Sequence, residues 1–392
     1  MILTILPSVP VWIESNELVF DRKFYDGLLQ YTSLWPGHIR CVMRKSRQDI
    51  PDFGLIKINE KDLPFGLKIV DSCKEISTTH LAGSNTILAS GDNHELLHIS
   101  SLCQGDEIRC IYIIEYTLKT RLQIVALNAP TFLHRLKRSF SAVQQEKRRL
   151  KAFLLADGIQ GNGVPSFKKY ASDTKENLLY FDNRVKSTEI ITQIELNQRL
   201  EYLQLKRPLR LAFSGRLIKI KGANDLVKVA ELLERIGVEF VLSIYGTGDL
   251  TTYMKKQINE KNLTEKVILK GSVDFHSALL PALKAHTDLF ICLHKQGDPS
   301  CTYLETLACG VPIVGYANEA FAGILSKNDV GWSAPINDIT KIAGLIERIS
   351  KQRHLISEKS LNSINIAIKN NFEITFQRRI NHLVGTQITL DD

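Results

Sequence analysis

The amino-acid sequence predicts an α/β protein of two doubly wound domains. Its 392 residues exceed what one hydrophobic core usually serves, so two domains are expected. From residue 209 onward, short apolar runs alternate with amphipathic stretches, a pattern typical of a parallel sheet with helices on both faces. A Lys-Arg-Pro sequence at residues 206–208 precedes this half and marks the expected domain boundary.

The second half has the most regular pattern. Strands are expected where apolar runs are short, and helices where apolar residues recur every three or four positions. We expect strands at residues 209–214, 239–245, 267–270, 288–293 and 312–316, and helices at 223–235 and 250–261. Nucleotides bind to such sheets at the carboxyl ends of the strands.

The first half is less regular but suits the same α/β class. Its apolar runs are separated by polar and glycine-containing stretches. We expect strands at residues 2–7, 38–43, 85–90 and 109–115, and helices at 24–34 and 133–155.

The composition excludes several classes of protein. With 44% hydrophobic and 23% charged residues, long disorder is not expected. No apolar run reaches about 18 residues, so no membrane-spanning helix is expected. The amino terminus lacks the basic and cleavage regions of a signal peptide and suits a buried strand. The seven cysteines form no Cys-x-x-Cys pair, which indicates reduced thiols in a cytosolic protein and argues against zinc.

Most of the net charge of +8 comes from one segment. Residues 134–151 contain seven cations and one acid, Glu146, and so supply six of the eight positive charges. Apolar residues recur there at helical spacing, which predicts an amphipathic basic helix. It can be a solvated surface helix, a helix on an anionic membrane, or a nucleic-acid contact, which no recognised motif supports. The candidate membrane-surface cations are Arg135, Lys137, Arg138, Lys147, Arg148, Arg149 and Lys151.

A basic turn follows the strand expected at 209–214. Gly215 permits a tight turn, Arg216 and Lys221 bring two cations to the strand end, and Gly222 precedes a helix. Two cations beside unpaired backbone N–H groups form an anion site that suits a diphosphate. Taken alone, the motif can also be a basic surface loop.

A second motif spans residues 298–314 and follows the fourth strand of this half. Pro299, with Ser300 or Thr302, favours the start of a helix, whose free N–H groups suit a phosphate. Glu305 lies in the first turns of this otherwise apolar helix, where a carboxylate can accept hydrogen bonds from vicinal ribose hydroxyls. Compensation of the helix dipole, or a salt bridge, is the alternative role of Glu305.

Together these motifs resemble those of the retaining, metal-independent GT-B glycosyltransferases, specifically family 4. That family carries a Gly-Arg-Leu…Lys-Gly loop, here residues 215–222, and an acidic helix followed by Gly-x-Pro, here residues 305–312. The resemblance covers roughly residues 208–350. The turn at 162–164, Asn-Gly-Val, is also similar to one that family members carry before the interdomain linker.

The resemblance implies two Rossmann-like domains that face each other across a cleft. Residues 1–205 would bind the acceptor, residues 206–371 the nucleotide-sugar donor, and residues 372–392, with a helix near 372–383, would cross back to the first domain.

The resemblance also implies the roles of individual residues. Arg216 and Lys221 would bind the donor diphosphate and stabilise the departing nucleotide, and Glu305 would bind the ribose, with no metal and no cofactor. A loop at 271–273 resembles the nucleobase loop of the family, whereas Gly246-Thr-Gly248 indicates only a tight turn. The further donor-binding candidates are Gly215, Gly271, Val273, Asp298, Ser300, Cys301 and Thr302.

One departure from the family concerns the donor sugar. The family usually has a second glutamate eight residues before the one that matches Glu305, and Gly297 stands there in this sequence. We expect the adjacent Asp298 to take its place. His294 and Lys295 are further candidates, with a solvated loop as the alternative.

The acceptor half also departs from the common pattern. The glycine-rich loop often found after the first strand is missing from residues 9–16. Asp92 and His94, after one expected strand, and Glu115, after the next, are the candidate acceptor or sugar-site residues. Asp92 or Asn93 as a helix N-cap, and His94 as a surface residue, are the alternatives.

These observations predict a cytoplasmic hexosyltransferase, peripheral on the inner membrane face, that uses a UDP- or GDP-linked donor. The acceptor would be a glycan or a lipid-linked sugar, in polysaccharide, glycolipid or lipopolysaccharide biosynthesis, and no nucleic acid is expected as a partner. A GT-B epimerase or phosphorylase, and a non-catalytic nucleotide-sugar-binding protein, are the open alternatives.

Overall fold

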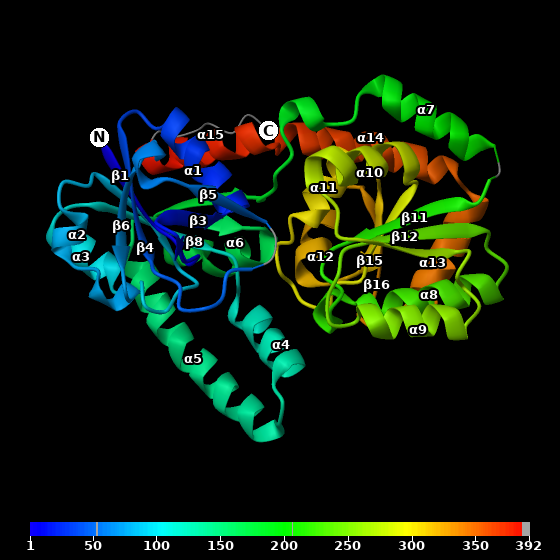
Figure 1. Cartoon of the computed structure of the whole chain (residues 1–392), viewed down its shortest axis with the longest axis horizontal. Coiled ribbons are helices and arrows are strands. Elements are labelled where there is room, and N and C mark those ends of the chain that lie inside the picture. Colours follow the sequence, from blue (N-terminus) through cyan, green and yellow to red (C-terminus); the bar gives the residue numbers. More distant parts are fainter. Residues whose placement is uncertain (52–53, 206, 386–392) are drawn as a thin grey trace. The chain divides into compact units, whose positions relative to one another are not determined.

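A computed structural model of the chain describes residues 1–51, 54–205 and 207–385 (Figure 1). It contains two compact units. The first consists of residues 1–122, 130–180 and those from 373 on, and the second of residues 123–129 and 181–372. Each unit has a parallel sheet with helices packed on it, so the predicted α/β class is confirmed.

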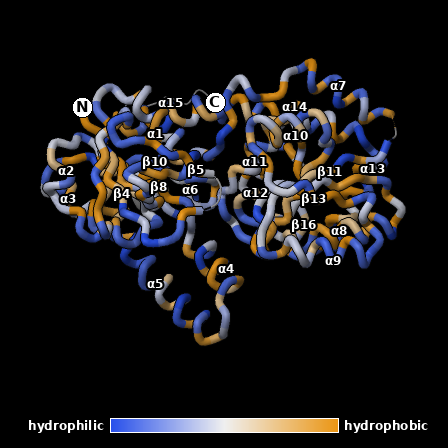
Figure 2. The backbone as a smooth tube through the Cα atoms, in the orientation of Figure 1, coloured by the Kyte–Doolittle hydropathy of each residue, from blue (hydrophilic) through white to orange (hydrophobic). Residues whose placement is uncertain are grey.

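The first unit is built on a seven-stranded parallel sheet in the order β10-β9-β8-β7-β1-β4-β6. Its inner strands are short apolar runs because helices cover both faces, and all five residues of β7 are buried. Figure 2 shows these strands as mainly hydrophobic segments. The strands are β1 (Ile2–Leu6), β4 (His38–Arg44), β6 (Gly66–Val70), β7 (Thr86–Ser90), β8 (Arg109–Ile114), β9 (Gly158–Asn162) and β10 (Glu176–Tyr180).

A small antiparallel sheet, β2-β3-β5, follows β1 and was not predicted. It consists of β2 (Trp12–Glu14), β3 (Glu17–Asp21) and β5 (Leu55–Ile58). The tight turn between β2 and β3 has positive φ at Ser15 (50°) and Asn16 (68°), as a two-residue hairpin turn of type I′ requires. This hairpin accounts for part of the segment where a glycine-rich loop was found to be missing.

The helices of the first unit are fixed by caps and by aromatic packing. Asp21 caps the first helix, where its carboxylate accepts a hydrogen bond from the Phe24 N–H (2.9 Å). In the last helix, Phe376 packs edge-on against Tyr31 with 5.1 Å between ring centroids. The helices are α1 (Arg22–Leu34), α2 (Thr78–Leu81), α3 (Ile99–Gly105), α4 (Leu118–Asn128, whose residues from 123 on are assigned to the second unit), α5 (Phe132–Leu155), α6 (Val164–Tyr170) and α15 (Phe372–Val384).

The last helix therefore packs on the first unit although it follows the second in sequence. Buried Gln160 accepts a hydrogen bond from Arg379 Nε (3.0 Å) and donates one to the Arg379 carbonyl (2.9 Å). The residues beyond 385 of the segment expected to cross back lie outside the described part of the chain.

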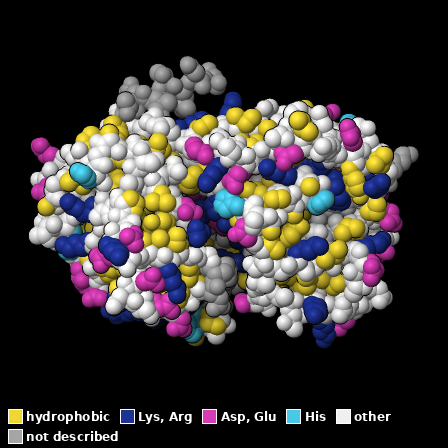
Figure 3. Space-filling view, turned by 45° about the horizontal axis from the view of Figure 1, so that its top comes forward, with side chains coloured by type: hydrophobic (Ala, Val, Ile, Leu, Met, Phe, Trp, Pro, Cys, Tyr) yellow, Lys and Arg dark blue, Asp and Glu magenta, His cyan; other side chains and the backbone are white. Residues whose placement is uncertain are grey.

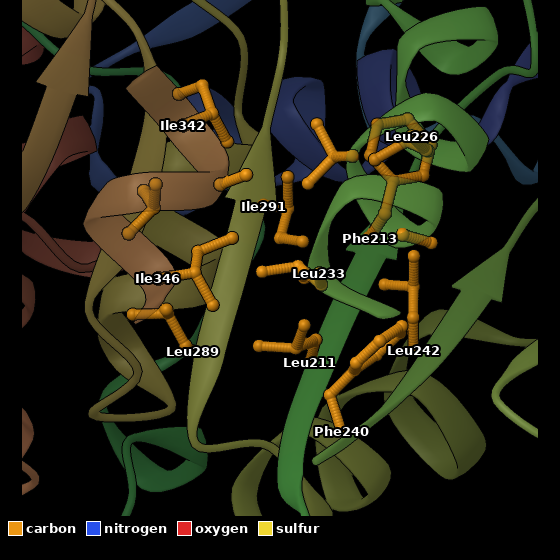
Figure 4. Close-up of a cluster of buried hydrophobic side chains, with 14 of the residues drawn as sticks. Leu211, Phe213, Leu226, Leu233, Phe240, Leu242, Leu289, Ile291, Ile342 and Ile346 are labelled. Carbon is orange, nitrogen blue, oxygen red and sulfur yellow. The ribbon is translucent and has the colours of Figure 1, made fainter. Parts of the chain in front are cut away.

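The second unit is built on a six-stranded parallel sheet in the order β13-β12-β11-β14-β15-β16. In Figure 4, apolar side chains of β11, β12 and β14 meet those of α8 and α13 in one cluster, which includes fully buried Phe213 and Ile291. The strands are β11 (Leu209–Ser214), β12 (Phe240–Tyr245), β13 (Val267–Gly271), β14 (Leu289–Cys292), β15 (Ile313–Tyr316) and β16 (Gly331–Ala334).

The helices of the second unit surround this sheet. The strand at 209–214 and the helix at 223–235 have the predicted bounds. The helices are α7 (Gln193–Gln204), α8 (Ala223–Arg235), α9 (Thr251–Glu260), α10 (Leu280–His286), α11 (Thr302–Ala308), α12 (Glu319–Leu325), α13 (Ile339–Lys351) and α14 (His354–Lys369).

The boundary between the units differs from the predicted one at residue 205. Residues 181–205 pack on the second unit, where Val185 and Leu203 lie in its apolar clusters. Arg199 of α7 donates hydrogen bonds to the carbonyls of Cys309 (2.6 Å) and Gly310 (2.5 Å). The boundary therefore falls after Tyr180, because α7 buries its apolar and arginine side chains on the second unit.

The surface drawn in Figure 3 carries basic, acidic and apolar side chains intermixed. No helix in the described part of the chain is both long and apolar enough to cross a membrane. All seven cysteines are described, none forms a disulfide, and all but Cys301 are buried.

Candidate donor and acceptor sites

The basic turn after β11 packs against the loop that follows β14. Gly222 has a φ of 70°, and a Cβ atom there would lie 2.0 Å from the Leu293 carbonyl oxygen, so no other residue fits. The Lys295 N–H donates to the Ile220 carbonyl (3.0 Å) and joins the two loops. The two sequence motifs are thus brought together at the carboxyl ends of adjacent strands.

The segment at 246–248 supports this turn and is itself a turn, as predicted. Gly246 has a φ of 121°, and a Cβ atom there would lie 2.1 Å from the Gly215 carbonyl oxygen. The Leu217 N–H donates to the Thr247 carbonyl (2.9 Å). The glycine is needed for close approach of two backbone segments.

The two predicted cations of the turn differ in environment. Arg216 is exposed, whereas Lys221 Nζ forms an ion pair of 2.8 Å with Asp298 Oδ2, and the two paired side chains are 12% and 11% exposed. Burial raises the pKa of Asp298, but the Lys221 ammonium outweighs this effect and holds the pKa below its usual value. Asp298 is therefore an ionised carboxylate that lies next to the predicted diphosphate-binding lysine.

The loop at 294–298 carries several buried polar atoms. Both ring nitrogens of His294, Oε1 of Gln296 and Oδ1 of Asp298 have no hydrogen-bond partner among the described residues. Burial, with a further contribution from Lys221, lowers the pKa of His294 to about 3, so its imidazole is neutral at pH 7. Such a concentration of unsatisfied polar atoms is rare in a protein interior and suits a polyhydroxylated ligand. Gln296 was not predicted as a site residue, because no sequence motif includes it.

Two other residues of this loop have structural roles. A Cβ atom on Gly297 would lie 3.0 Å from the Cβ of Glu319, so the position usually held by glutamate in the family is crowded here. Lys295 forms an ion pair with Asp225 (2.6 Å), which also accepts a hydrogen bond from the Tyr316 hydroxyl (3.0 Å). Lys295 was considered a sugar-site candidate, but the structure pairs it with the buried Asp225.

Helix α11 begins at Thr302, one of the residues predicted to start it. The Ser300 hydroxyl lies 3.1 Å from the Thr302 hydroxyl, and Cys301 is the residue before the helix. Glu305 is buried and its carboxylate pairs with Arg184, with 2.8 Å from Nε to Oε1 and 3.2 Å from Nη2 to Oε2. The salt bridge considered for Glu305 is therefore present, and its partner was missed because it lies 121 residues earlier in the chain.

The predicted nucleobase loop follows β13. Gly271 ends the strand with a φ of 71°, and its carbonyl accepts a hydrogen bond from the Gly246 N–H (2.6 Å). Val273 is 36% exposed, and a π-helical turn begins two residues later at Phe275. This loop and the turn after β11 thus meet at Gly246.

The acceptor-side candidates Asp92 and Glu115 lie at the carboxyl ends of β7 and β8, and Asn162 is the last residue of the neighbouring β9. Asp92 accepts hydrogen bonds from the backbone N–H of Glu115 (2.7 Å) and Tyr116 (3.3 Å). Glu115 Oε1 accepts one from Asn162 Nδ2 (3.4 Å). Burial raises the pKa of Asp92, although Arg149 and the two N–H groups oppose this effect. The structure thus links Asp92, Glu115 and Asn162 by hydrogen bonds and leaves His94 exposed on the surface.

One of the cations predicted to lie at a membrane surface, Arg149, is buried instead. Arg149 is 1% exposed and donates to the carbonyls of Gly91 (3.0 Å) and Tyr116 (3.0 Å). It also pairs with Glu146 (3.1 Å) and Asp92 (2.9 Å). Arg149 therefore belongs to a buried ion network, because the helical phase of α5 turns it and Glu146 toward the sheet.

The other predicted cations of α5 are exposed, namely Arg135, Lys137, Arg138, Lys147, Arg148 and Lys151. The apolar side chains of its first half are exposed as well: Leu133 at 75%, Phe140 at 65% and Leu136 at 52%. In Figure 1, this half of α5 extends away from the sheet of its own unit. The apolar stripe that predicted a helix is thus largely unburied within this unit.

Among the described residues, no group of three or more His, Cys, Asp or Glu side chains is arranged to hold a metal ion.

The comparisons with known proteins agree with this architecture. A family model described as glycosyl transferases group 1 matches residues 197–370. The amylovoran biosynthesis glycosyltransferase AmsK of Erwinia amylovora is 27% identical over 157 residues, which are 38% of this chain and only 37% of that protein.

Solved structures match over nearly the whole chain. HepE from Anabaena, in complex with UDP, has a TM-score of 0.66 at 10% identity and covers 98% of this chain and 99% of its own. WaaG, a glycosyltransferase involved in lipopolysaccharide biosynthesis, has a TM-score of 0.60 at 12% identity and covers 98% and 100%. Residues 197–370 thus match the group 1 glycosyltransferases, and the chain has the GT-B fold.

Proposed function

We propose that this chain transfers a sugar from a UDP- or GDP-linked donor to a glycan or lipid-linked acceptor, with retention of the anomeric configuration. The observation that carries the proposal is the arrangement of Lys221, Asp298 and Glu305, which lie on the loops and helix after β11 and β14 in a group 1 glycosyltransferase domain. The UDP in the HepE structure supports a uridine nucleotide as the first donor to test.

The proposed chemistry requires charge stabilisation at the leaving group. As the bond from the sugar C1 to the phosphate oxygen breaks, negative charge grows on the diphosphate, and Lys221 and Arg216 stabilise it. The acceptor oxygen bonds to C1 on the same face, and its proton passes to the leaving phosphate oxygen. These two cations replace the metal in this scheme, so we propose that turnover persists in EDTA.

The buried polar atoms of residues 294–298 support the proposal that the donor sugar binds beside this loop. Neutral His294, Gln296 and Asp298 together offer both donors and acceptors to sugar hydroxyls. We assign Asp298 to the role of the family glutamate that Gly297 replaces. The acceptor would bind to the first unit, near Asp92, Glu115 and Asn162.

We also propose that the first half of α5 rests on an anionic membrane at the cytoplasmic face, where lipid-linked acceptors are found. Exposed Leu133, Leu136 and Phe140 would enter the interface, and the neighbouring cations would contact anionic headgroups. A role in polysaccharide or lipopolysaccharide biosynthesis follows from such acceptors and from the relatives AmsK and WaaG.

The test starts with a thermal-shift screen against nucleotide-sugars, because a hit identifies the base and the sugar together. Turnover is then followed as nucleotide release with membrane-lipid and glycan acceptors, with and without EDTA. Lys221→Ala and Glu305→Ala should each lose roughly 100-fold or more in turnover while they keep the native circular dichroism spectrum. Lys256→Ala, at a side chain 72% exposed on α9, is the matched control.

The outcomes separate the alternatives. Wild-type turnover in both variants would show that the assignment is wrong. Release of sugar phosphate that depends on added phosphate would indicate a phosphorylase, and conversion of the nucleotide-sugar without an acceptor would indicate an epimerase. Nucleotide-sugar binding without turnover in any acceptor extract would indicate a non-catalytic binding protein.

A further inference from the structure

Arg184 lies in an irregular segment whose backbone is held on both sides. The Asn183 amide donates to the Asn370 carbonyl (2.8 Å) and accepts a hydrogen bond from the Val185 N–H (3.0 Å). The Val185 carbonyl accepts one from the Phe372 N–H (2.9 Å), and Val185 is 1% exposed. The backbone from which the Arg184 side chain extends is therefore fixed.

Two contacts fix the guanidinium itself. Its Nε and Nη2 bind the two carboxylate oxygens of Glu305 at 2.8 Å and 3.2 Å. Its carbon lies 3.8 Å from the centroid of the Phe275 ring, in cation–π contact. Because a bidentate pair has one planar geometry, Glu305 cannot rotate about its last bond while the pair persists. Arg184 thus sets the direction in which the carboxylate presents its remaining lone pairs.

The count of lone pairs decides what Glu305 can still bind. A carboxylate has about four acceptor positions, and the guanidinium uses one on each oxygen. One position on each oxygen remains, which is the number that two vicinal hydroxyls require. Arg184 also neutralises the charge of Glu305, whose side chain is only 8% exposed. This matters because the proposed ligand, a nucleotide, is itself an anion.

We propose that Arg184 is a positioning residue that orients Glu305 for the ribose diol of the donor, with Phe275 as its support beside the predicted nucleobase loop. This inference rests on the proposed function, because it requires a ribonucleoside diphosphate as the donor. Arg184 acts through Glu305 and makes no contact with the reacting atoms.

The experiment measures binding of UDP, 2′-deoxy-UDP and inorganic pyrophosphate by calorimetry, with GDP and 2′-deoxy-GDP in parallel. Wild-type protein should bind the ribonucleotide roughly tenfold or more tightly than its deoxy analogue, since one hydrogen bond to a charged group is lost. Arg184→Gln should bring this ratio to within about twofold and weaken the ribonucleotide about tenfold, with pyrophosphate binding unchanged. Arg184→Lys, which keeps the charge but not the bidentate pair, should give an intermediate ratio.

Arg235→Gln is the matched control, because Arg235 is 69% exposed and its contact with Glu231 is 3.7 Å long. It should leave the affinities for all of these ligands at the wild-type value. In turnover assays, Arg184→Gln should raise the KM for the donor far more than it lowers kcat, which a loss of folded protein would not do.

The possible results are distinct. The inference is overturned if Arg184→Gln keeps the wild-type ratio of ribonucleotide to deoxynucleotide affinity. Tighter ribonucleotide binding in that variant also overturns it, because it would mean that Arg184 blocks the site. If Arg184→Gln does not fold, Arg184→Lys decides, and a wild-type ratio in that variant overturns the inference. A wild-type protein that binds no nucleoside diphosphate contradicts the proposed function instead.

Discussion

Lys221 and Asp298 form a 2.8 Å ion pair that joins the loop after β11 to the loop after β14. Both side chains are nearly buried, so neither charge is well solvated without the other. Removal of one partner from a buried pair leaves an uncompensated charge in a medium of low polarity. The pair therefore couples the stability of the second unit to the cation proposed to bind the donor diphosphate.

This coupling can be measured by a double-mutant cycle. Lys221→Met should lower the free energy of unfolding by about 3 kcal/mol because it leaves the Asp298 carboxylate unpaired, and Lys221→Met with Asp298→Asn should recover part of this loss. Urea unfolding provides the free energies. The exposed pair Lys256–Glu260, 3.6 Å apart, is the control, with a coupling below about 0.5 kcal/mol. Additive effects at Lys221 and Asp298 would contradict the prediction.

His294 should make the second unit less stable in mild acid. Burial and Lys221 lower its folded-state pKa to about 3, whereas an unfolded histidine has a pKa near 6.5. Between these values the unfolded chain binds more protons, so the free energy of unfolding falls as the pH falls below about 6.5, by up to about 1.4 kcal/mol per pH unit. Urea unfolding at pH 7, 6 and 5 should show a steeper loss for wild type than for His294→Asn.

The control for this experiment is His94→Asn, since His94 is exposed on the first unit. It should follow the pH dependence of the wild-type protein. Parallel curves for wild type and His294→Asn would show that His294 does not contribute to acid sensitivity.

Arg149 and Arg148 are neighbours in sequence, but their replacement should affect the stability of the first unit very differently. Arg149→Met leaves Glu146 and Asp92 without their main cation and should lower the free energy of unfolding of the first unit by about 3 to 5 kcal/mol. Arg148→Met, at an exposed position, should change it by less than about 0.5 kcal/mol. Chemical unfolding followed by circular dichroism checks both values, and equal effects would contradict the buried position of Arg149.

The membrane proposal can be tested on the exposed residues of α5. Charge reversal of Arg148 and Lys151 to Glu should weaken binding to vesicles with about one third anionic lipid by roughly tenfold or more. Leu133→Ser with Phe140→Ser should weaken it as well, because both side chains are exposed and apolar. Co-sedimentation measures the bound fraction.

Ile194→Ser is the control for the apolar variant, since Ile194 is 72% exposed but lies on α7 of the second unit. Its binding to vesicles should remain at the wild-type level. Unchanged binding in the α5 variants would make α5 an ordinary surface helix.

Local sequence patterns were sufficient for much of the fold. The strand at 209–214 and the helix at 223–235 have the predicted bounds because their apolar periodicity is regular over the whole element. Gly215 and Gly222 likewise predicted the turn after β11, since glycine adopts backbone conformations that other residues rarely adopt. Gly310 and Pro312 predicted the end of α11, since proline cannot continue a helix.

The tertiary structure decided which side chains meet. The pairing of Arg184 with Glu305 joins positions 121 residues apart, and no local pattern distinguishes that arginine from others. Arg149 shows the same difference within one helix. Its charge predicted an exposed side chain, but α5 turns it toward the sheet, where it pairs with the carboxylates of Asp92 and Glu146. Backbone preferences act over a few residues and can be read along the chain, whereas ion pairing and burial depend on distances that exist only after the chain has folded.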